Sequence, residues 1–351
     1  MPHRDDDLDD LLARAGAAPS GTRRGPRPTG RVSMAMVAAR AGVSGQTVSR
    51  VVNGSPHVDP GTRERVEAAM AALGYRPHRA ARALRTGRSH TIGVVAQTLA
   101  TVGNSRMLQA VADSAAARGY ALTVVTLGSA GPIGEAFERL REQGADGAIV
   151  LNEASALARD ADASGLALVV VDAPADPRFA VLGTDHAEGA RRATAHLLGR
   201  GSTTVHHLAG PEPSFAAAER ERGWREALAA AGAPVPVPIR GDWSAASGHA
   251  AGLRLAGDPG VEAVFAANDQ MALGVLRALA DAGRRVPEEV AVAGFDDVAD
   301  AADYLPPLTT VRQDFDALAA HAVRLVVAQV EDGAPAEQVL LAPELVVRRS
   351  S

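Results

Sequence analysis

The 351-residue sequence contains no cysteine, which excludes a disulfide framework and any metal site built on thiolates. Aromatic residues make up only 3% of the chain, although 46% of it is hydrophobic. A core rich in alanine and valine suits helices packed on parallel strands. The length allows two or three folded units, one of them with a large buried core.

Long apolar runs are also missing. No stretch reaches the roughly 18 residues that a membrane-spanning helix needs. The first thirty residues lack the apolar core of a signal peptide and carry an acidic run at residues 5–10 instead. We therefore expect a cytoplasmic protein that does not bind a membrane.

Lysine is absent, so all 36 residues in the lysine and arginine count are arginine, and they are unevenly distributed. Residues 31–90 hold ten arginines and three carboxylates, a net charge of +7. Residues 91–351 hold 21 arginines and 33 carboxylates, a net charge of −12. A compact basic segment in an acidic protein is typical of a domain that binds a polyanion.

Composition and periodicity divide the chain into four segments. Residues 1–30 contain too few apolar residues to offset the entropy of ordering, so we expect a disordered tail. Residues 31–77 are predicted to form a helix-turn-helix domain, and residues 78–89 a short helix and linker. Residues 90–351 are predicted to form a two-lobed domain.

Three short helices with clear boundaries are predicted in the basic segment. Ser33 and Ser44 are suited to cap a first helix that runs to residue 41 and a second over residues 45–52. A third helix begins at Pro60 and stops before Gly74. The turn between the first two helices contains a glycine, which is typical of a helix-turn-helix unit.

From residue 90 onward, short apolar runs alternate with helical stretches, a pattern that predicts βαβ units and parallel sheets. Because about 260 residues exceed what one such sheet usually takes, we expect two similar lobes with a ligand cleft between them. The apolar runs lie at residues 91–95, 122–126, 148–151, 168–171, 205–208, 264–266 and 290–293.

The run AGVSGQTVSRVVN at residues 41–53 resembles the DNA-reading motif of the LacI/GalR family of bacterial regulators. In that family the second helix lies in the major groove, which implies contacts from Gln46 to adenine and from Arg50 to guanine. Gly45 matches a third base-reading position but offers no side chain there. The expected phosphate contacts are Ser44, Thr47, Ser49 and Asn53.

The run YRPHRAARAL at residues 75–84 resembles the hinge helix of the same family. There, two copies enter the minor groove and a leucine from each opens the central base step. The resemblance implies that Leu84 is this wedge, with Arg79 and Arg82 on the flanking phosphates. A paired hinge also implies a homodimer on a palindromic, double-stranded DNA operator.

Polar motifs in the rest of the chain resemble the same family almost to the C-terminus. They imply an α/β effector core of the periplasmic-binding-protein type, with two Rossmann-like lobes, after the all-α helix-turn-helix domain. Asp172 and Asp296 each end an apolar run, where α/β sheets place ligand groups. Arg220, predicted to open a helix, matches the family's ligand-clamping arginine. The motifs are LAGP, GDWSAASG, AANDQMALG, AGFDDVAD and PPLTTVRQDF.

A small sugar is the expected effector. Carboxylates and amides hold hydroxyl groups, an arginine fork holds paired oxygens, and a flat apolar surface supports the ring. The predicted contacts are Asp172, Arg220, Trp243, Asn268, Asp296 and Gln313. Simpler roles stay open, because a strand-end aspartate can cap a helix and a tryptophan can be ordinary core.

These features favour a repressor whose operator affinity is lowered by a sugar, with a β-galactoside as the first choice. Thr184 replaces an aromatic residue that the family can place against the sugar, so a close copy of that site is not expected. A nucleobase co-repressor, a secreted sugar-binding protein and a glycosidase are the alternatives. The sequence shows no phosphate-binding loop and no metal-ligand cluster, and we expect no catalytic residues, cofactor or metal.

Overall fold

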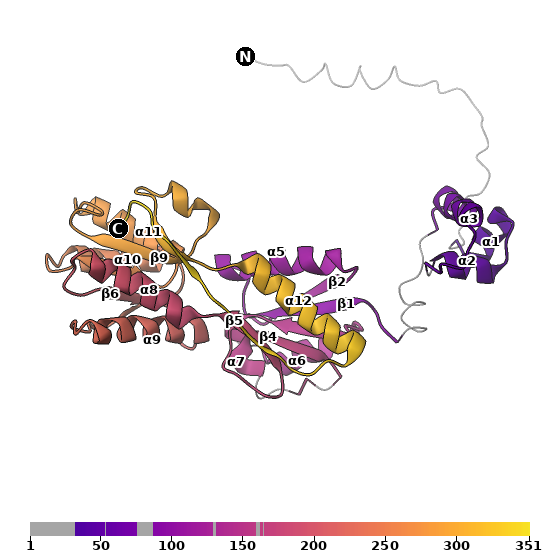
Figure 1. The fold of residues 1–351 in the computed structure, drawn as a ribbon, viewed down its shortest axis with the longest axis horizontal. Helices are drawn as coiled ribbons and strands as arrows, with labels where there is room; N and C mark the ends of the chain where they lie inside the picture. Colours follow the sequence, from indigo (N-terminus) through magenta and orange to yellow (C-terminus); the bar gives the residue numbers. More distant parts are fainter. Residues whose placement is uncertain (1–31, 53, 76–86, 129–130, 159–161, 164) are drawn as a thin grey trace, which may run out of the picture. The chain divides into compact units, whose positions relative to one another are not determined.

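The computed structural model describes residues 32–52, 54–75, 87–128, 131–158, 162–163 and 165–351. It divides the chain into two compact units, Met1–His78 and Arg79–Ser351 (Figure 1). The predicted tail and hinge helix lie outside the described residues, and so do Asn53, Arg79, Arg82 and Leu84. Among the helices that are described, none has the length and apolar character needed to cross a bilayer.

The first unit consists of three helices, α1 (Met34–Ala41), α2 (Gly45–Val52) and α3 (Pro60–Leu73). Ser33 caps α1 by accepting a hydrogen bond from the Met36 amide, and Asp59 caps α3 in the same way at 3.0 Å from the Thr62 amide. Gly42 ends α1 with a φ of 66°, a left-handed conformation that favours glycine. Small apolar side chains from all three helices form one core, which includes Val37, Val48, Val51, Val66 and Ala69.

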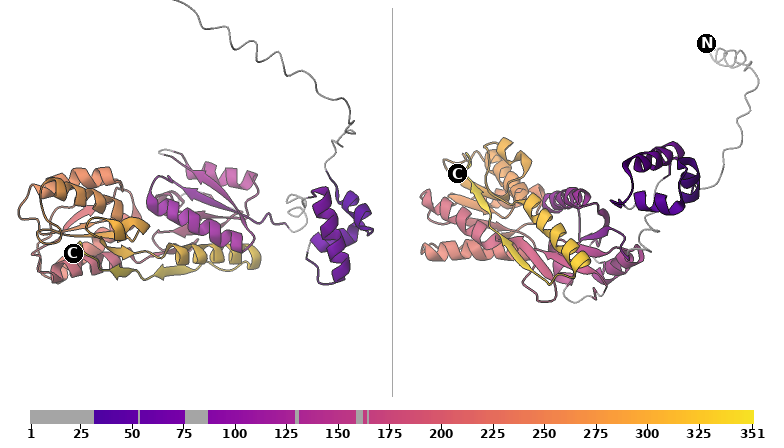
Figure 2. Two further views of the ribbon diagram at one scale, coloured as in Figure 1. Left: turned by 90° about the horizontal axis from the view of Figure 1, so that it is seen from above. Right: turned by 45° about the vertical axis from the view of Figure 1, so that its right-hand side comes forward.

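The second unit contains two six-stranded sheets, each of which belongs to one lobe (Figures 1 and 2). The first-lobe sheet has the order β11-β5-β4-β3-β1-β2 and is parallel throughout. Its strands are β1 (Thr91–Ala96), β2 (Ala121–Thr126), β3 (Gly147–Val150), β4 (Ala167–Val171), β5 (Ala180–Thr184) and β11 (Gln338–Leu341). Its helices are α5 (Val102–Ala117), α6 (Ile133–Glu142), η1 (Asn152–Ala154), α7 (Ser155–Ala158) and α12 (Phe315–Asp332).

The second-lobe sheet has the order β12-β10-β9-β8-β6-β7, with the β10–β12 pair antiparallel. Its strands are β6 (His206–Ala209), β7 (Ile239–Arg240), β8 (Ala263–Ala266), β9 (Ala291–Asp296), β10 (Thr309–Arg312) and β12 (Glu344–Val346). Its helices are α8 (His186–Gly199), α9 (Phe215–Ala230), α10 (Ala245–Ala256), α11 (Asp269–Asp281) and η2 (Ala299–Asp303).

Each sheet is covered on both faces, which explains why its central strands are continuously apolar. In the first lobe, α5 and α12 pack together over one face and α6 and α7 cover the other (Figure 1). In the second lobe, α10 and α11 cover one face and α8 and α9 the other. The α8–α9 contact is so close that a methyl group on Gly223 would lie 2.0 Å from the carbonyl oxygen of Ala187.

The described chain crosses between the lobes three times: between β5 and α8, between β10 and α12, and between β11 and β12. The second crossing contains Gln313, because β10 belongs to the second lobe and α12 packs on the first. The cleft between the lobes is therefore bordered by the carboxyl ends of strands from both sheets.

Candidate functional site

A cavity lies between the lobes and is lined from both sides. The first lobe contributes Asn152, Glu153 and Asp172, the second contributes residues from α9, β9 and two connecting segments, and Gln313 comes from a crossing. All six residues predicted as effector contacts line this one cavity: Asp172, Arg220, Trp243, Asn268, Asp296 and Gln313.

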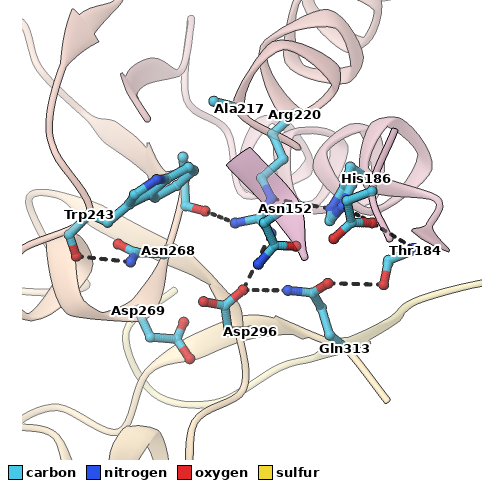
Figure 3. Close-up of polar contacts among 12 residues, drawn as sticks. Asn152, Thr184, His186, Ala217, Arg220, Trp243, Asn268, Asp269, Asp296 and Gln313 are labelled. Atoms are coloured by element: carbon cyan, nitrogen blue, oxygen red, sulfur yellow. Dashed lines mark hydrogen bonds and ion pairs between the residues drawn. The ribbon is translucent and has the colours of Figure 1, made fainter. Parts of the chain in front are cut away.

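Arg220 lies at the centre of the polar contacts (Figure 3). The sequence analysis predicted that Arg220 opens a helix, which is wrong. Helix α9 begins at Phe215, so Arg220 lies in its second turn. Its guanidinium lies 3.4 Å from Asp296 Oδ1, donates to the carbonyl oxygen of Ala267, and stands 3.8 Å above the centre of the Phe295 ring. Burial lowers the pKa of Arg220 and the nearby carboxylates oppose that shift, so the ion pairs hold the buried cation.

A chain of hydrogen bonds joins the strand ends of the two lobes through Gln313 (Figure 3). The Gln313 amide donates to Asp296 Oδ1 at 2.6 Å, and the Thr184 hydroxyl donates to Gln313 Oε1 at 2.9 Å. Burial raises the pKa of Asp296, while the Arg220 cation and the Gln313 hydrogen bond lower it. Thr184 ends β5 and Asp296 ends β9, so these hydrogen bonds connect a strand end of the first lobe to a strand end of the second.

His186, which the sequence analysis missed, links Asp172 to Arg220. Its Nε2 atom lies 2.9 Å from Asp172 Oδ1, and its Nδ1 accepts a hydrogen bond of 3.3 Å from Arg220 Nε. Asp185 caps α8, and His186 is the first residue of that helix. The signal was present in the run TDHAEG, because a helix that starts directly after a strand end places its first side chain at the cleft.

Helix capping, the simpler role considered for the strand-end aspartates, applies to neither of them, whereas Trp243 does pack against the second-lobe core. Asp172 accepts from the Thr184 amide at 3.3 Å and Asp296 from Gln313, so neither caps a following helix. Asn268 does cap α11, because its Oδ1 accepts from the Met271 amide at 2.9 Å. Its amide nitrogen donates to the carbonyl oxygen of Trp243, which ties the cap to the cavity wall (Figure 3).

Trp243 makes a direct contact across the cleft. Its Nε1 donates to Glu153 Oε1 at 3.2 Å, and Glu153 belongs to the first lobe. The second carboxylate oxygen of Glu153 is buried and has no hydrogen-bond partner. The neighbouring Asn152 donates to the side chain of Asn104. Neither Asn152 nor Glu153 was predicted, although both follow β3 as Asp172 follows β4.

Several residues that line the cavity have a strained backbone conformation, with a positive φ. Of the six described non-glycine residues with positive φ, four line it, namely Asn152 at 46°, Asp172 at 54°, Trp243 at 73° and Asp296 at 115°. Such conformations cost of order 1–3 kcal/mol each and persist where surrounding contacts impose them. Asn and Asp tolerate this region, but tryptophan rarely adopts it. A cluster of this kind is typical of a ligand-binding site.

In the first unit, α2 separates its predicted base-reading side chains from its core. Gly45, Gln46 and Arg50 are exposed, whereas Val48 and Val51 are buried. Gln46 and Arg50 are four residues apart and therefore lie on the same face of the helix.

The predicted phosphate contacts on α2 also have local partners. The Ser44 hydroxyl caps the helix by accepting from the Thr47 amide at 3.1 Å, and the two hydroxyls lie 3.0 Å apart. Ser49 is half-buried. Within the ranges that the structure describes, no group of three or more potential ligands for a metal ion occurs.

Comparison with known proteins agrees with this two-part organisation. Residues 33–78 match the family model for bacterial regulatory proteins of the lacI family, and residues 194–351 match the model for a periplasmic binding protein-like domain. The lactose operon repressor of Escherichia coli (strain K12) is 35% identical over 326 residues, which cover 91% of this chain and 90% of the repressor.

Two solved structures are similar over most of the chain. The lac repressor dimer bound to operator and the anti-inducer ONPF has a TM-score of 0.83 at 35% identity, covering 92% of this chain and 99% of the other. A complex of the transcriptional regulator CelR with cellobiose has a TM-score of 0.69 at 35% identity, covering 92% and 100%. Neither protein is named as an enzyme. Likeness of this extent, together with the matched DNA-binding segment, shows that the chain belongs to the LacI family of bacterial regulatory proteins.

Proposed function

We propose that this regulator is a repressor that binds a palindromic operator as a homodimer and releases it when a small sugar occupies the cavity between the lobes. A β-galactoside is the first candidate for that sugar. The single observation that carries the proposal is that six polar and aromatic residues surround one cavity between the lobes, and that several residues lining it have a strained backbone conformation. The two similar structures, one with ONPF and one with cellobiose, support a sugar-like ligand.

The DNA-binding half of the proposal rests on α2. Exposed Gln46 and Arg50 on one helix face suit bidentate contacts to adenine and guanine, and the segment has a net charge of +7. The proposed phosphate and minor-groove contacts add Ser44, Thr47, Ser49, Asn53, Arg79, Arg82 and Leu84.

A sugar changes operator affinity only if it binds one lobe arrangement better than another. The cavity meets that condition, because Asp172 belongs to the first lobe and Arg220, Asn268 and Asp296 to the second. A ligand that contacts both sides favours one relative orientation of the lobes. Couplings between two sites of this kind are typically about 1–3 kcal/mol.

The test is an operator titration with and without sugar, on wild type and on Arg220→Ala. The variant should keep operator binding and lose the response to sugar, because it removes a cavity side chain and leaves α2 unchanged. Asp172→Asn, which keeps the shape of the side chain, is a second variant in case loss of a buried arginine unfolds the domain. Arg225→Ala is the control, since Arg225 lies on the same helix and pairs with Glu221 at the surface.

Two results would contradict the proposal. A normal sugar response in both cavity variants would remove Arg220 and Asp172 from the site. Tighter operator binding in the presence of the ligand would instead indicate a co-repressor.

A further inference from the structure

The cavity between the lobes carries an excess of negative charge. Among the described residues that line it, three have carboxylates, Glu153, Asp172 and Asp296, whereas one has a cationic group, Arg220. A ligand that enters this cavity meets more anionic than cationic side chains.

The Arg220 cation is already engaged. Its three nitrogen atoms contact Asp296, the carbonyl oxygen of Ala267 and His186 Nδ1. In the described part of the chain, no arginine side chain lies within ion-pair distance of Glu153. Glu153 is therefore a carboxylate at the cavity wall that makes no ion pair, although its charge raises the pKa of the nearby Arg220.

Glu153 is also held in place. Trp243 Nε1 donates to its Oε1 at 3.2 Å, while Oε2 is buried and has no hydrogen-bond partner. A buried oxygen without a partner costs free energy, and the cost is larger when it belongs to a charged group. A ligand that donates to Oε2 recovers that cost.

Glu153 lies where two hollows between the lobes meet. Glu153 and Asn152 also line a second hollow between the lobes, together with Ser214 and Phe215 from the second lobe. The two spaces thus share a wall at Glu153. A ligand seated against Arg220 and Trp243 can extend a substituent toward it.

We propose that Glu153 is a specificity-determining residue that makes this cavity prefer a sugar with a free amino group over the corresponding neutral sugar, and reject sugar phosphates. This inference rests on the proposed function, in which the cavity binds a sugar. An ammonium group forms charge-assisted hydrogen bonds with a carboxylate, which are stronger than those of a hydroxyl group. A phosphate group meets three carboxylates at close range and is repelled.

The test compares matched ligands by calorimetry on the full-length protein. The amino sugars are glucosamine, galactosamine and 6-amino-6-deoxygalactose, and their partners are glucose, galactose, the N-acetyl derivatives and galactose 6-phosphate. At least one amino sugar should bind about tenfold or more tightly than its neutral parent, the scale of one added hydrogen bond to a charged group. The sugar phosphate should bind more weakly than its neutral parent.

Glu153→Gln tests the residue itself, because glutamine keeps an acceptor for Trp243 and removes the charge. The preference for the amino sugar should fall to within about twofold of its neutral parent. Glu212→Gln is the matched control, since Glu212 lines the second hollow and its side chain is 76% exposed. That variant should keep the wild-type preference.

The outcomes separate this inference from the proposed function. Neutral sugars that bind wild type as tightly as amino sugars overturn the inference and leave the proposed function intact. A preference that survives Glu153→Gln also overturns it. Absence of binding by every sugar in the set, with operator binding intact, overturns the proposed function.

Discussion

At the scale of single residues, the cavity residues that the sequence predicted best are those at the ends of strands. Asp172 and Asp296 end parallel strands, and the cavity lies at those ends. The same rule applied to β3 would have found Glu153, but it follows a four-residue strand and begins no recognisable motif. His186 was missed because its role depends on Arg220, which is 34 positions away in the chain.

His207 is a residue whose burial has a measurable consequence. It stacks against the rings of Trp224 and Phe265 inside the second lobe, and its Nδ1 lies 2.9 Å from the carbonyl oxygen of Phe265. Burial lowers the pKa of His207 to about 4, from the usual 6.5. The unfolded chain therefore takes up this proton at higher pH than the folded chain does.

We predict that the stability due to neutral His207 is complete above about pH 6.5 and declines as the pH falls toward 4. At pH 5 the loss should be roughly 2 kcal/mol, because one pKa unit corresponds to about 1.4 kcal/mol. The measurement is the free energy of unfolding at pH 7 and pH 5, for wild type and His207→Gln. The variant should show a smaller difference between the two pH values. His57→Gln, at an exposed position in the first unit, should match wild type, and an equal pH effect in the His207 variant would refute the assignment.

At the scale of elements, the sequence predicted those whose ends carry chemical markers. The helices of the first unit begin and end as predicted, because Ser33, Asp59 and Gly74 fix their caps. Seven apolar runs correspond to strands, but β5, β7, β10, β11 and β12 were not identified. The strand β7 has two residues and β12 three, too few to show a period, and β11 is half-exposed at the edge of its sheet.

Gly223 provides a prediction about the packing of α8 and α9. A Cβ atom there would lie 2.0 Å from a backbone oxygen of α8, so Gly223→Ala forces the helices apart. We expect a loss of about 3 kcal/mol or more in unfolding free energy, measured by denaturant titration. Gly134→Ala is the matched control, because Gly134 is also helical and has nothing within 4 Å of that position. The control should be neutral or more stable by about 0.5 kcal/mol, and equal behaviour of the two variants would contradict the close contact.

At the scale of the whole molecule, the division into a basic three-helix unit and an acidic two-lobed unit followed from charge and periodicity. What the sequence did not reveal is how the lobes share the chain. The first lobe takes α12 and β11 from near the end of the sequence, and no local pattern marks them as belonging to it. Such pairing depends on contacts between residues far apart in the chain.

We predict a homodimer that associates through the second unit, because a palindromic operator requires two-fold symmetry. The neighbouring helices α10 and α11 each expose a leucine, Leu253 at 50% and Leu273 at 38%, and they are a candidate surface for this contact. Sedimentation at micromolar concentration should give a dimer for wild type and a monomer for Leu273→Glu. Val237→Glu, at a loop position that is 88% exposed, should stay dimeric. A monomeric or tetrameric wild type would contradict the prediction.

The three crossings between the lobes also determine when the protein can fold during synthesis. The ribosome releases β1 to β5 early, but the first-lobe core still lacks Leu318, Ala322 and Val326 from α12. Those side chains emerge only after nearly all of the second lobe. A nascent chain therefore carries one open apolar face on its first sheet until α12 has been synthesised, a period in which exposed surface favours aggregation. The first lobe, and with it the cleft, can therefore be completed only after most of the second lobe has been synthesised.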